Sequence, residues 1–454
     1  MGGSGVDVTR RLAQFAVETR YRDLPAAVVE KGKERILDTL GCMIGGCREA
    51  LAPLMVKYAK EGGGRPEATI VGFGHMTNVA NAALVNGTLG HALDFDDTQI
   101  SFSGHPSTVI LPAALSLGEK LKLSGKVVLE AFTVGFEVAC KIGRGVNPRL
   151  YKNGWHATSV IGSLGAAVAA GKILGLDAGE MASAFGLAAS QSSGLKENFG
   201  TMTKPFHAGR AAQSGVISAL LAKNGFTASQ QILEAKRGFC AVFSGECDVN
   251  KIFENLGNPH DIVSPGVHTK PYPSCLMTHS IIDAALFLAE SYDIKPEDVD
   301  TVECGIAPFA SDVLIHSNPQ TGLQAKFSAP YVVTAALIDR KVSLEHFIDE
   351  KLQDSRIQAL IQRVKISVQP ELESPLTPAK VMMKLRNGQE VTKRVDIATG
   401  NPEKPMSLDQ MIAKYKNCVG FMMSPKKTDE TIDRILHFEE VRDVSKLIAL
   451  TVKK

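Results

Sequence analysis

Carboxylates, hydroxyls and imidazoles are concentrated in one short segment of this 454-residue chain. The run Gly90–Thr98 has the sequence GHALDFDDT, and GHPST follows it at Gly104–Thr108. Apolar, helix-like sequence flanks both runs. Because ionisable groups beside apolar sequence are costly unless they pair or react, this segment favours an enzyme that moves protons at neutral pH. The alternative is that Asp94, Asp96 and Asp97 only cap helices and hold a turn.

Four further segments place a histidine, lysine or tyrosine in apolar or glycine-rich surroundings. They are Asn153–Ser159 (NGWHATS), Thr203–Arg210 (TKPFHAGR), Lys270–His279 (KPYPSCLMTH) and Lys326–Tyr331 (KFSAPY). Each offers a group that could transfer a proton or bind an anion. A single histidine at a helix start is more often structural, and Lys204 and Arg210 could equally be solvated surface charges. The recurrence of the pattern at five places favours one shared site.

The bulk composition is that of an ordinary globular protein, with 44% hydrophobic and 22% charged residues. The net charge is +2, from 50 basic and 48 acidic residues, and gives no reason to expect a nucleic acid or a membrane surface as partner. The eight cysteines form no CxxC pair and no zinc-ribbon spacing, which favours free thiols in a reducing compartment. Residues 1–5 lack the layout of a secretion signal. We therefore expect a cytoplasmic protein.

Helical periodicity dominates the first 225 residues. The pattern predicts one helix that begins after Pro25 and others over 8–19, 79–91, 112–121, 127–142, 158–174, 181–192 and 207–223. Several are rich in Ala and Gly, which lets helix backbones approach closely. The most apolar stretch, 159–171, is interrupted by Lys172 before it could span a bilayer. We expect this half of the chain to be all-α.

The composition changes near Pro265. Strands are predicted over 299–306, 364–368, 381–386 and 390–395, and helices over 278–292, 328–339 and 344–348. Asn387–Gly388, between the last two strands, is a strong hairpin signal. Ser407 is a good N-cap for a return to helix. Since 454 residues exceed what one core usually supports, we predict a mainly α fold: a large all-α helical domain (1–267 and 405–454) with an inserted, smaller α+β lid domain (268–404).

These segments together resemble the MmgE/PrpD family, which includes 2-methylcitrate dehydratase, cis-aconitate decarboxylase and iminodisuccinate epimerase. The motifs that carry the resemblance are LDFDDT at 93–98, GHPS at 104–107, GWH at 154–156 and TKPFHAGRAA at 203–212. Agreement in order extends from about residue 30 to residue 340. The resemblance implies an active site between a helical domain and an α+β lid, a homodimer, and no metal or organic cofactor.

Carried over position by position, the resemblance implies a site made by Asp94, Thr98, His105, His156, Lys204, His279 and Tyr331. This set is more similar to the decarboxylase and epimerase branch than to the dehydratase branch. The dehydratase pattern has a tryptophan-containing insertion between the aspartate run and GHPS, whereas Gln99–Ser103 here has no tryptophan. Asn also commonly replaces Asp96 in that branch.

The family's substrates are small di- or tricarboxylates that react at a carbon next to a carboxylate. Proton transfer there passes through a carbanion-like state, which cationic groups stabilise best in a site shielded from water. We expect Lys204 and protonated histidines to supply that charge, with Lys270 as a further candidate on the lid side.

His105 is our expected principal acid/base group, because the ordinary pKa of imidazole lies near working pH. Asp94 and Thr98 would orient His105 or the substrate. His156 and Lys204 would hold carboxylates. From the lid side, two further groups would close the site: His279 and Tyr331.

Three interpretations outside catalysis of this kind stay open. The aspartate run in a helical domain also suits the magnesium–diphosphate sites of terpene synthases, but no convincing second metal-binding motif follows it. A zinc hydrolase would need HExxH or a comparable spacing, which the eleven histidines do not form. The non-enzymatic alternative is a helical scaffold or a binding protein for small acids. Within the family, dehydration, decarboxylation and epimerisation all stay open.

Overall fold

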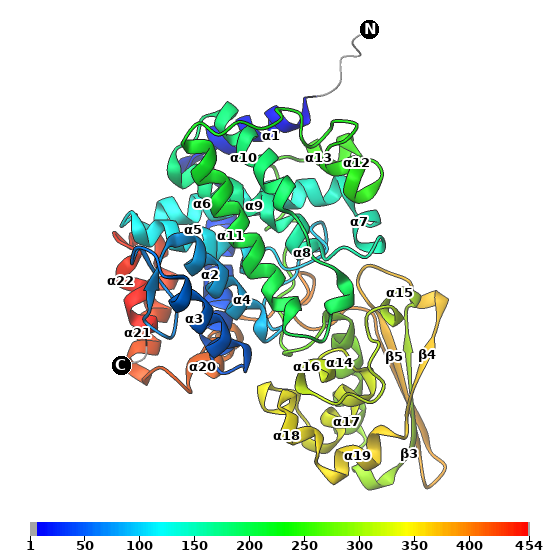
Figure 1. Ribbon diagram of the computed structural model, residues 1–454. Helices are drawn as coiled ribbons and strands as arrows, with labels where there is room; N and C mark the ends of the chain where they lie inside the picture. Colours follow the sequence, from blue (N-terminus) through cyan, green and yellow to red (C-terminus); the bar gives the residue numbers. More distant parts are fainter. Residues whose placement is uncertain (1–6, 453–454) are drawn as a thin grey trace.

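A computed structural model describes residues 7–452 of the chain, so the N-terminal residues 1–5 discussed above lie outside the described residues. The fold is mainly α with a small sheet, and Figure 1 shows two parts. We name residues 7–267 and 405–452 the helical part and residues 268–404 the α+β part. One hydrophobic core takes its side chains from 8–262 and 411–448, and a second takes them from 275–395 together with Phe199.

Long helices stacked side by side form the helical part (Figure 1). They are α1 (Val8–Glu18), α2 (Ala26–Gly46), α3 (Leu51–Gly62), α4 (Val79–Ala92), α5 (Ser107–Lys120), α6 (Gly125–Val146), α9 (Gly162–Leu174), α10 (Ala178–Gln191) and α11 (Thr203–Lys223). Shorter helices lie between them: α7 (Arg149–Lys152), α8 (Ala157–Val160), α12 (Phe239–Ser244) and α13 (Val249–Phe253).

The predicted helices of this part are present, with three corrections. The helix predicted from Pro112 begins at Ser107, because Pro106 takes the position before the first turn and Pro112 lies inside the helix. The predicted helix over 158–174 is divided into α8 and α9. The expectation of an all-α half is also wrong in one detail, since the two-residue strands β1 (Ala68–Thr69) and β2 (Met76–Thr77) pair antiparallel.

The segment Ala157–Leu174 is apolar and long enough to cross a membrane by composition alone. In the structure 83% of it is buried inside the protein. This is the packing of a core helix.

The C-terminal residues return to the first core. Helices α20 (Leu408–Val419), α21 (Pro425–Leu436) and α22 (Ser445–Ile448) complete the helical part. Ser407 is the N-cap as predicted, since its hydroxyl accepts a hydrogen bond from the Gln410 amide in a capping box. Helix α20 packs on α2. The side chain of Lys414 on α20 is buried there and donates to the Phe95 carbonyl.

The α+β part has a four-stranded sheet in the order β4-β3-β5-β6. The strands are β3 (Val299–Ile306), β4 (Val364–Val368), β5 (Ala379–Leu385) and β6 (Glu390–Val395). Strand β3 pairs parallel with β4 and antiparallel with β5, and β5 pairs antiparallel with β6. The predicted hairpin at Asn387–Gly388 is confirmed, and Gly388 has the positive φ of 89° that such a turn requires.

The α+β part also contains several helices. They are α14 (His279–Ser291), α15 (Pro308–Ser311), α16 (Gly322–Ala325), α17 (Ala329–Asp339), α18 (Asp349–Leu352) and α19 (Ser355–Ile361). Helix α14 packs against β5 and β6, and α17 packs against β4. The helix predicted over 344–348 is instead a single 3₁₀ turn, Leu344–Phe347.

Two glycines bring α4 and α11 into close contact, as the small-residue content predicts. A Cβ atom on Gly209 would lie 2.1 Å from the Leu84 carbonyl oxygen, and one on Gly87 would lie 2.9 Å from the Gly209 Cα. This crossing matters for function because α4 and α11 carry His91 and Lys204, which meet in the site described below.

We predict that Gly209→Ala destabilises the protein by about 1–3 kcal/mol, because the added methyl group forces two helix backbones apart. Gly179→Ala is the matched control: it is also helical, and its Cβ would find only the Asp177 Oδ1, at 3.4 Å. Alanine should be neutral or slightly stabilising there. Urea denaturation of both variants measures the difference, and an equal free energy of unfolding for the two would contradict this account of the crossing.

Candidate active site

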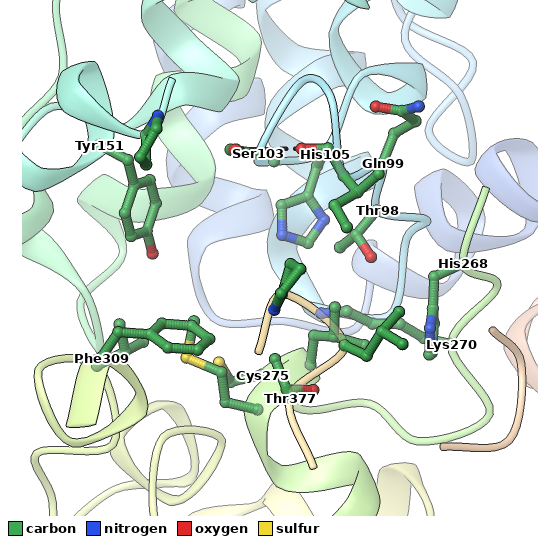
Figure 2. Close-up of a pocket in the computed structure, with 18 of the residues that line it drawn as sticks. Thr98, Gln99, Ser103, His105, Tyr151, His268, Lys270, Cys275, Phe309 and Thr377 are labelled. Carbon is green, nitrogen blue, oxygen red and sulfur yellow. Dashed lines mark hydrogen bonds between the residues drawn. The ribbon is translucent and has the colours of Figure 1, made fainter. Parts of the chain in front are cut away.

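A cavity of about 670 Å³ opens between the helical part and the α+β part. The helical part contributes mostly polar groups, including Asp94, Thr98, His105, His156, Lys196 and Lys204. The α+β part contributes His268, Lys270, Cys275, Phe309, Phe327 and Thr377. Figure 2 shows the His105 ring projecting into this space from one side, with Phe309, Cys275 and Thr377 facing it from the other.

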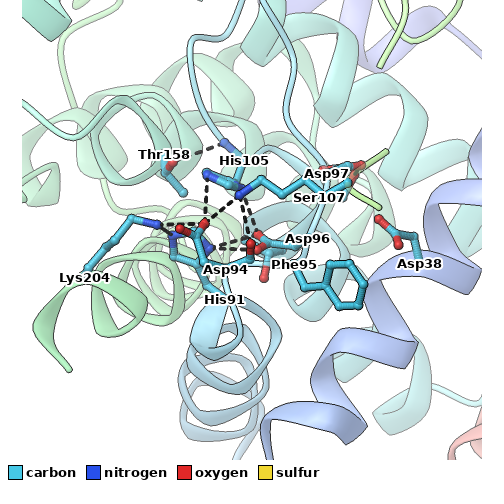
Figure 3. A network of polar contacts seen from close by, with 12 residues as sticks. Asp38, His91, Asp94, Phe95, Asp96, Asp97, His105, Ser107, Thr158 and Lys204 are labelled. Atoms are coloured by element: carbon cyan, nitrogen blue, oxygen red, sulfur yellow. Dashed lines mark hydrogen bonds and ion pairs between the residues drawn. The ribbon is translucent and has the colours of Figure 1, made fainter. Parts of the chain in front are cut away.

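Asp94 is the centre of the charged groups in this cavity (Figure 3). Its Oδ1 lies 3.1 Å from Lys204 Nζ on α11 and 2.8 Å from Lys270 Nζ of the α+β part. Burial alone would raise the pKa of Asp94, but the two ammonium groups hold it well below its usual range. The carboxylate is therefore ionised at neutral pH and fixed between the two parts of the molecule.

Asp96 holds two histidines through the same ring atom. The Nδ1 atoms of His91 and His105 lie 2.9 Å and 3.2 Å from Asp96 Oδ2 (Figure 3). An ionised carboxylate can only accept, so the His91 ring carries its proton on Nδ1 and has a free electron pair on Nε2. That pair accepts from Lys204 Nζ at 3.0 Å. The Nδ1 of His105 lies close to the same oxygen but has no hydrogen-bond partner among the described residues. The His105 Nε2 is 3.7 Å from Asp94 Oδ1, and the His105 side chain lines the cavity.

The histidines of this site have pKa values below their ordinary range in the free protein, so they are neutral there at pH 7. Burial lowers the pKa of His91 and of His268 to about 3, with neighbouring lysines adding to the effect. The pKa of His105 is lowered and that of His156 is held well below its usual range for the same reasons. In the free protein, the positive charge around Asp94 therefore comes from the ammonium groups of Lys204 and Lys270.

Five of the seven predicted site residues line the cavity: Asp94, Thr98, His105, His156 and Lys204. The structure does not bring the other two to its wall. The His279 ring lies behind His268, with Nε2 3.2 Å from the Ser274 carbonyl oxygen. The Tyr331 hydroxyl donates to the His346 carbonyl inside the core of the α+β part.

Sequence reasoning missed three residues of this site. His91 lies within the GHALDFDDT run, and its spacing of five from Asp96 gave no signal for their contact. His268 lines the cavity two residues before Lys270, in a proline-rich loop. Thr377 lines it from the opposite side and has a φ of +53°, which a β-branched residue rarely adopts. Such backbone strain is typical of residues at functional sites.

Several polar atoms of the cavity wall have no hydrogen-bond partner among the described protein atoms. They are Asp94 Oδ2, Thr98 Oγ1, His105 Nδ1 and His268 Nε2. Buried polar groups are nearly always paired in native proteins. These atoms therefore mark positions where a polar ligand would complete the site.

Asp97 belongs to a separate group of charges behind the cavity. Its Oδ2 accepts from the Ser107 hydroxyl at 2.5 Å and lies 3.8 Å from Arg35 Nη1. Burial, together with the nearby Asp38, raises the pKa of Asp97 to about 7. Asp97 does not line the cavity, so of the three aspartates only Asp94 faces it directly.

Ligand atoms of His91, Asp94, Asp96 and His105 lie within 4.8 Å of one another, a spacing that could hold a metal ion. These atoms are already engaged, however. Asp94 contacts two ammonium groups, and Asp96 accepts from the His91 imidazole and lies 3.2 Å from His105 Nδ1. A divalent cation would have to displace Lys204 and Lys270, so the arrangement suits an anionic ligand better than a metal.

Comparison of the chain with known proteins identifies its family. Residues 10–251 match the MmgE/PrpD N-terminal domain and residues 272–438 match the MmgE/PrpD C-terminal domain. A cis-aconitate decarboxylase of Homo sapiens is 28% identical over 98% of this chain and 94% of its own length. A cis-aconitate decarboxylase of Aspergillus terreus is 25% identical over 98% of this chain and 95% of its own. The chain therefore belongs to the MmgE/PrpD family, as its motifs indicate.

Proposed function

We propose that the protein is a lyase that acts by proton transfer next to a carboxylate on a small di- or tricarboxylate, with decarboxylation of cis-aconitate as the leading reaction. The observation that carries the proposal is that a buried imidazole, His105, and the ammonium groups of Lys204 and Lys270 all lie around Asp94 at the wall of one cavity. The names of the relatives favour decarboxylation over the other reactions of the family.

Decarboxylation of such a substrate breaks the bond between a carbon and its carboxylate and releases CO₂. The electron pair stays on the carbon framework and is delocalised over the adjacent double bond and carboxylate. A proton must then be added at the far end of this allylic system. Fixed ammonium groups in a site that excludes water stabilise the anion as it forms, and Lys204 and Lys270 are buried.

His105 is the proposed proton donor. In the free protein the lowered pKa of His105 leaves its ring neutral at pH 7. A neutral imidazole is a poor acid, so it must first acquire a proton. A bound polycarboxylate would promote this protonation, because its negative charges raise the pKa of a neighbouring imidazole. Asp96, which contacts Nδ1, would then stabilise the imidazolium. Thr98, Asp94 and His156 would orient the substrate from the wall of the cavity, with His279 and Tyr331 supporting the site from behind.

A dehydratase acting on 2-methylcitrate, an epimerase of the iminodisuccinate type and a polycarboxylate-binding protein without turnover are the alternatives. One experiment separates them: the purified protein is incubated with cis-aconitate, 2-methylcitrate and iminodisuccinate in deuterated water, and the products are followed by NMR. Deuterium uptake without net conversion would point to epimerisation. Tight binding without any reaction would favour a binding protein.

We also propose a cytoplasmic homodimer with no metal or organic cofactor and with no nucleic acid or membrane as partner. The family resemblance supports the dimer, and the near-neutral net charge supports the absence of the last two partners. Light scattering on the eluting protein measures the oligomeric state.

We predict that His105→Ala lowers kcat at least about 100-fold, the usual contribution of a general acid, and leaves the fold intact. His437→Ala is the control, since the His437 side chain is 58% exposed at the end of α21. Turnover of cis-aconitate by NMR and the far-ultraviolet circular dichroism of each variant are measured. Near-normal turnover by His105→Ala would remove His105 from the mechanism.

We further predict that polycarboxylate binding takes up close to one proton per site at pH 7. The sign follows from the lowered pKa of His105 in the free protein: the ring is neutral before binding and is protonated when anions raise its pKa. Titration calorimetry with propane-1,2,3-tricarboxylate in buffers of different ionisation enthalpy counts the protons. The uptake should disappear in His105→Gln and persist in His437→Gln, and proton release instead of uptake would refute the assignment.

A further inference from the structure

The turn Ala92–Phe95, which ends α4, sets the position of the Asp94 carboxylate. Asp94 has a φ of +51°, in the left-handed region that residues other than glycine avoid. Such a conformation persists only where the surrounding contacts enforce it. The Asp94 amide donates to the His91 carbonyl at 3.1 Å, and further on the Thr98 amide donates to the His268 carbonyl at 3.0 Å.

Three buried ammonium groups hold the carbonyl groups of this turn. Lys326 donates to Ala92 O at 3.1 Å, Lys270 to Asp94 O at 2.9 Å and Lys414 to Phe95 O at 2.6 Å. The three lysines follow these carbonyls in the chain by 234, 176 and 319 residues, respectively. Carbonyls at a helix C-terminus have no partner inside the helix and attract positive charge. Lys326 therefore acts as a cap for α4, which ends at Ala92, whereas Lys270 and Lys414 hold two carbonyls just beyond the end of the helix.

Two of these lysines have no part in the cavity wall. The side chains of Lys326 and Lys414 are 3% and 4% exposed, and neither lines the cavity. Lys414 also pairs with Asp38 at 2.6 Å and lies 4.0 Å from the centre of the Phe95 ring. Lys326 has Glu49, at 3.9 Å, as its acidic neighbour. Burying an ammonium group with so distant a counter-charge is costly. The hydrogen bond from Lys326 to Ala92 O is therefore the interaction that explains why Lys326 is buried at this position.

The two lysines reach the turn from different parts of the molecule. Lys326 lies between α16 and α17 of the α+β part, and Lys414 lies on α20 of the helical part. Lys326 thus links the placement of the α+β part to the backbone that carries Asp94. Lys414 fixes the Phe95 carbonyl from the side of the helical core.

We propose that Lys326 and Lys414 are positioning residues for the reaction of this site: they hold the turn Ala92–Phe95 in the strained conformation that places the Asp94 carboxylate between Lys204 and Lys270. This inference rests on the proposed function for its kinetic consequence. Its structural consequence, the ordering of the turn, can be measured without any substrate.

The test compares Lys326→Met and Lys414→Met with a matched control, Lys172→Met. Lys172 is equally buried, at 2% side-chain exposure, and donates to the Ala16 and Thr19 carbonyls, but it lies away from the turn. Amide hydrogen exchange, followed by mass spectrometry on the full chain, reports on the peptide that covers residues 92–99. We expect at least tenfold faster exchange there in the two test variants and no change in the control.

Kinetics on cis-aconitate supply the second measurement. Misplacing a catalytic group by a fraction of an ångström impairs the transition state more than it impairs binding. We therefore expect kcat to fall at least tenfold in both test variants, with KM within threefold of the wild type. Lys172→Met should keep the kcat of the wild type per folded molecule.

Unchanged exchange over 92–99 in either test variant overturns the proposal for that lysine, as does an equal increase in Lys172→Met. Faster exchange with an unchanged kcat also overturns the positioning role. Should a Met variant fail to fold, the corresponding Gln variant, which keeps a hydrogen-bond donor, replaces it under the same criteria. If the wild type turns over none of the three polycarboxylates, the proposed function fails, and exchange alone then decides whether these lysines order the turn.

Discussion

One carboxylate held between two buried ammonium groups determines the organisation of this molecule. Asp94 meets Lys204 from α11 and Lys270 from the α+β part at the same oxygen atom. An unpaired charge at this depth costs several kcal/mol, whereas the paired arrangement recovers that cost only if the geometry is held accurately. The close crossing of α4 and α11, and the contact between the two parts of the protein, are what hold it.

The same charges determine the protonation of the site. Asp94 and Asp96 are ionised and are balanced by Lys204 and Lys270, so additional positive charge on the imidazoles would be unfavourable before an anion enters. Burial also disfavours the protonated form, since it lowers the pKa of His91 and of His105. The positive and negative charges of the site are thus balanced when no ligand is bound, and a bound polycarboxylate would add an excess of negative charge. Under the proposed mechanism, His105 would gain a proton only when the polycarboxylate binds. The imidazolium form of His105 would then be present only in the complex with the polycarboxylate.

Local sequence signals predicted local structure well. Strands 299–306, 364–368 and 390–395 have the predicted bounds, and the Asn387–Gly388 hairpin and the Ser407 N-cap are confirmed. Alternation of apolar residues, turn-forming dipeptides and capping residues act over a few positions, so they can be recognised in one sequence. The start of α5 was predicted wrongly because Pro112, the expected first residue of the helix, lies inside it, and Pro106 precedes its first turn.

The site itself was only partly accessible from the sequence. The motifs named five residues of the cavity wall, but residue types could not show that the imidazoles are neutral, since burial causes this and burial is a property of the fold. Nor could they show that Tyr331 is directed toward His346 instead of the cavity. The contact of Lys326 with Ala92 joins positions 234 residues apart, beyond the range of any local pattern.

Long-range lysine contacts also explain why the chain needs both of its parts to form one site. The helical part carries Asp94, Thr98, His105, His156 and Lys204, yet the turn that aims Asp94 has a carbonyl, Ala92 O, to which a lysine of the α+β part donates. A helical part alone would leave that carbonyl without its ammonium partner and would leave the Asp94 carboxylate with one counter-charge instead of two. The geometry around Asp94 is therefore a property of the contact between the parts, and the cavity lies where that contact is made.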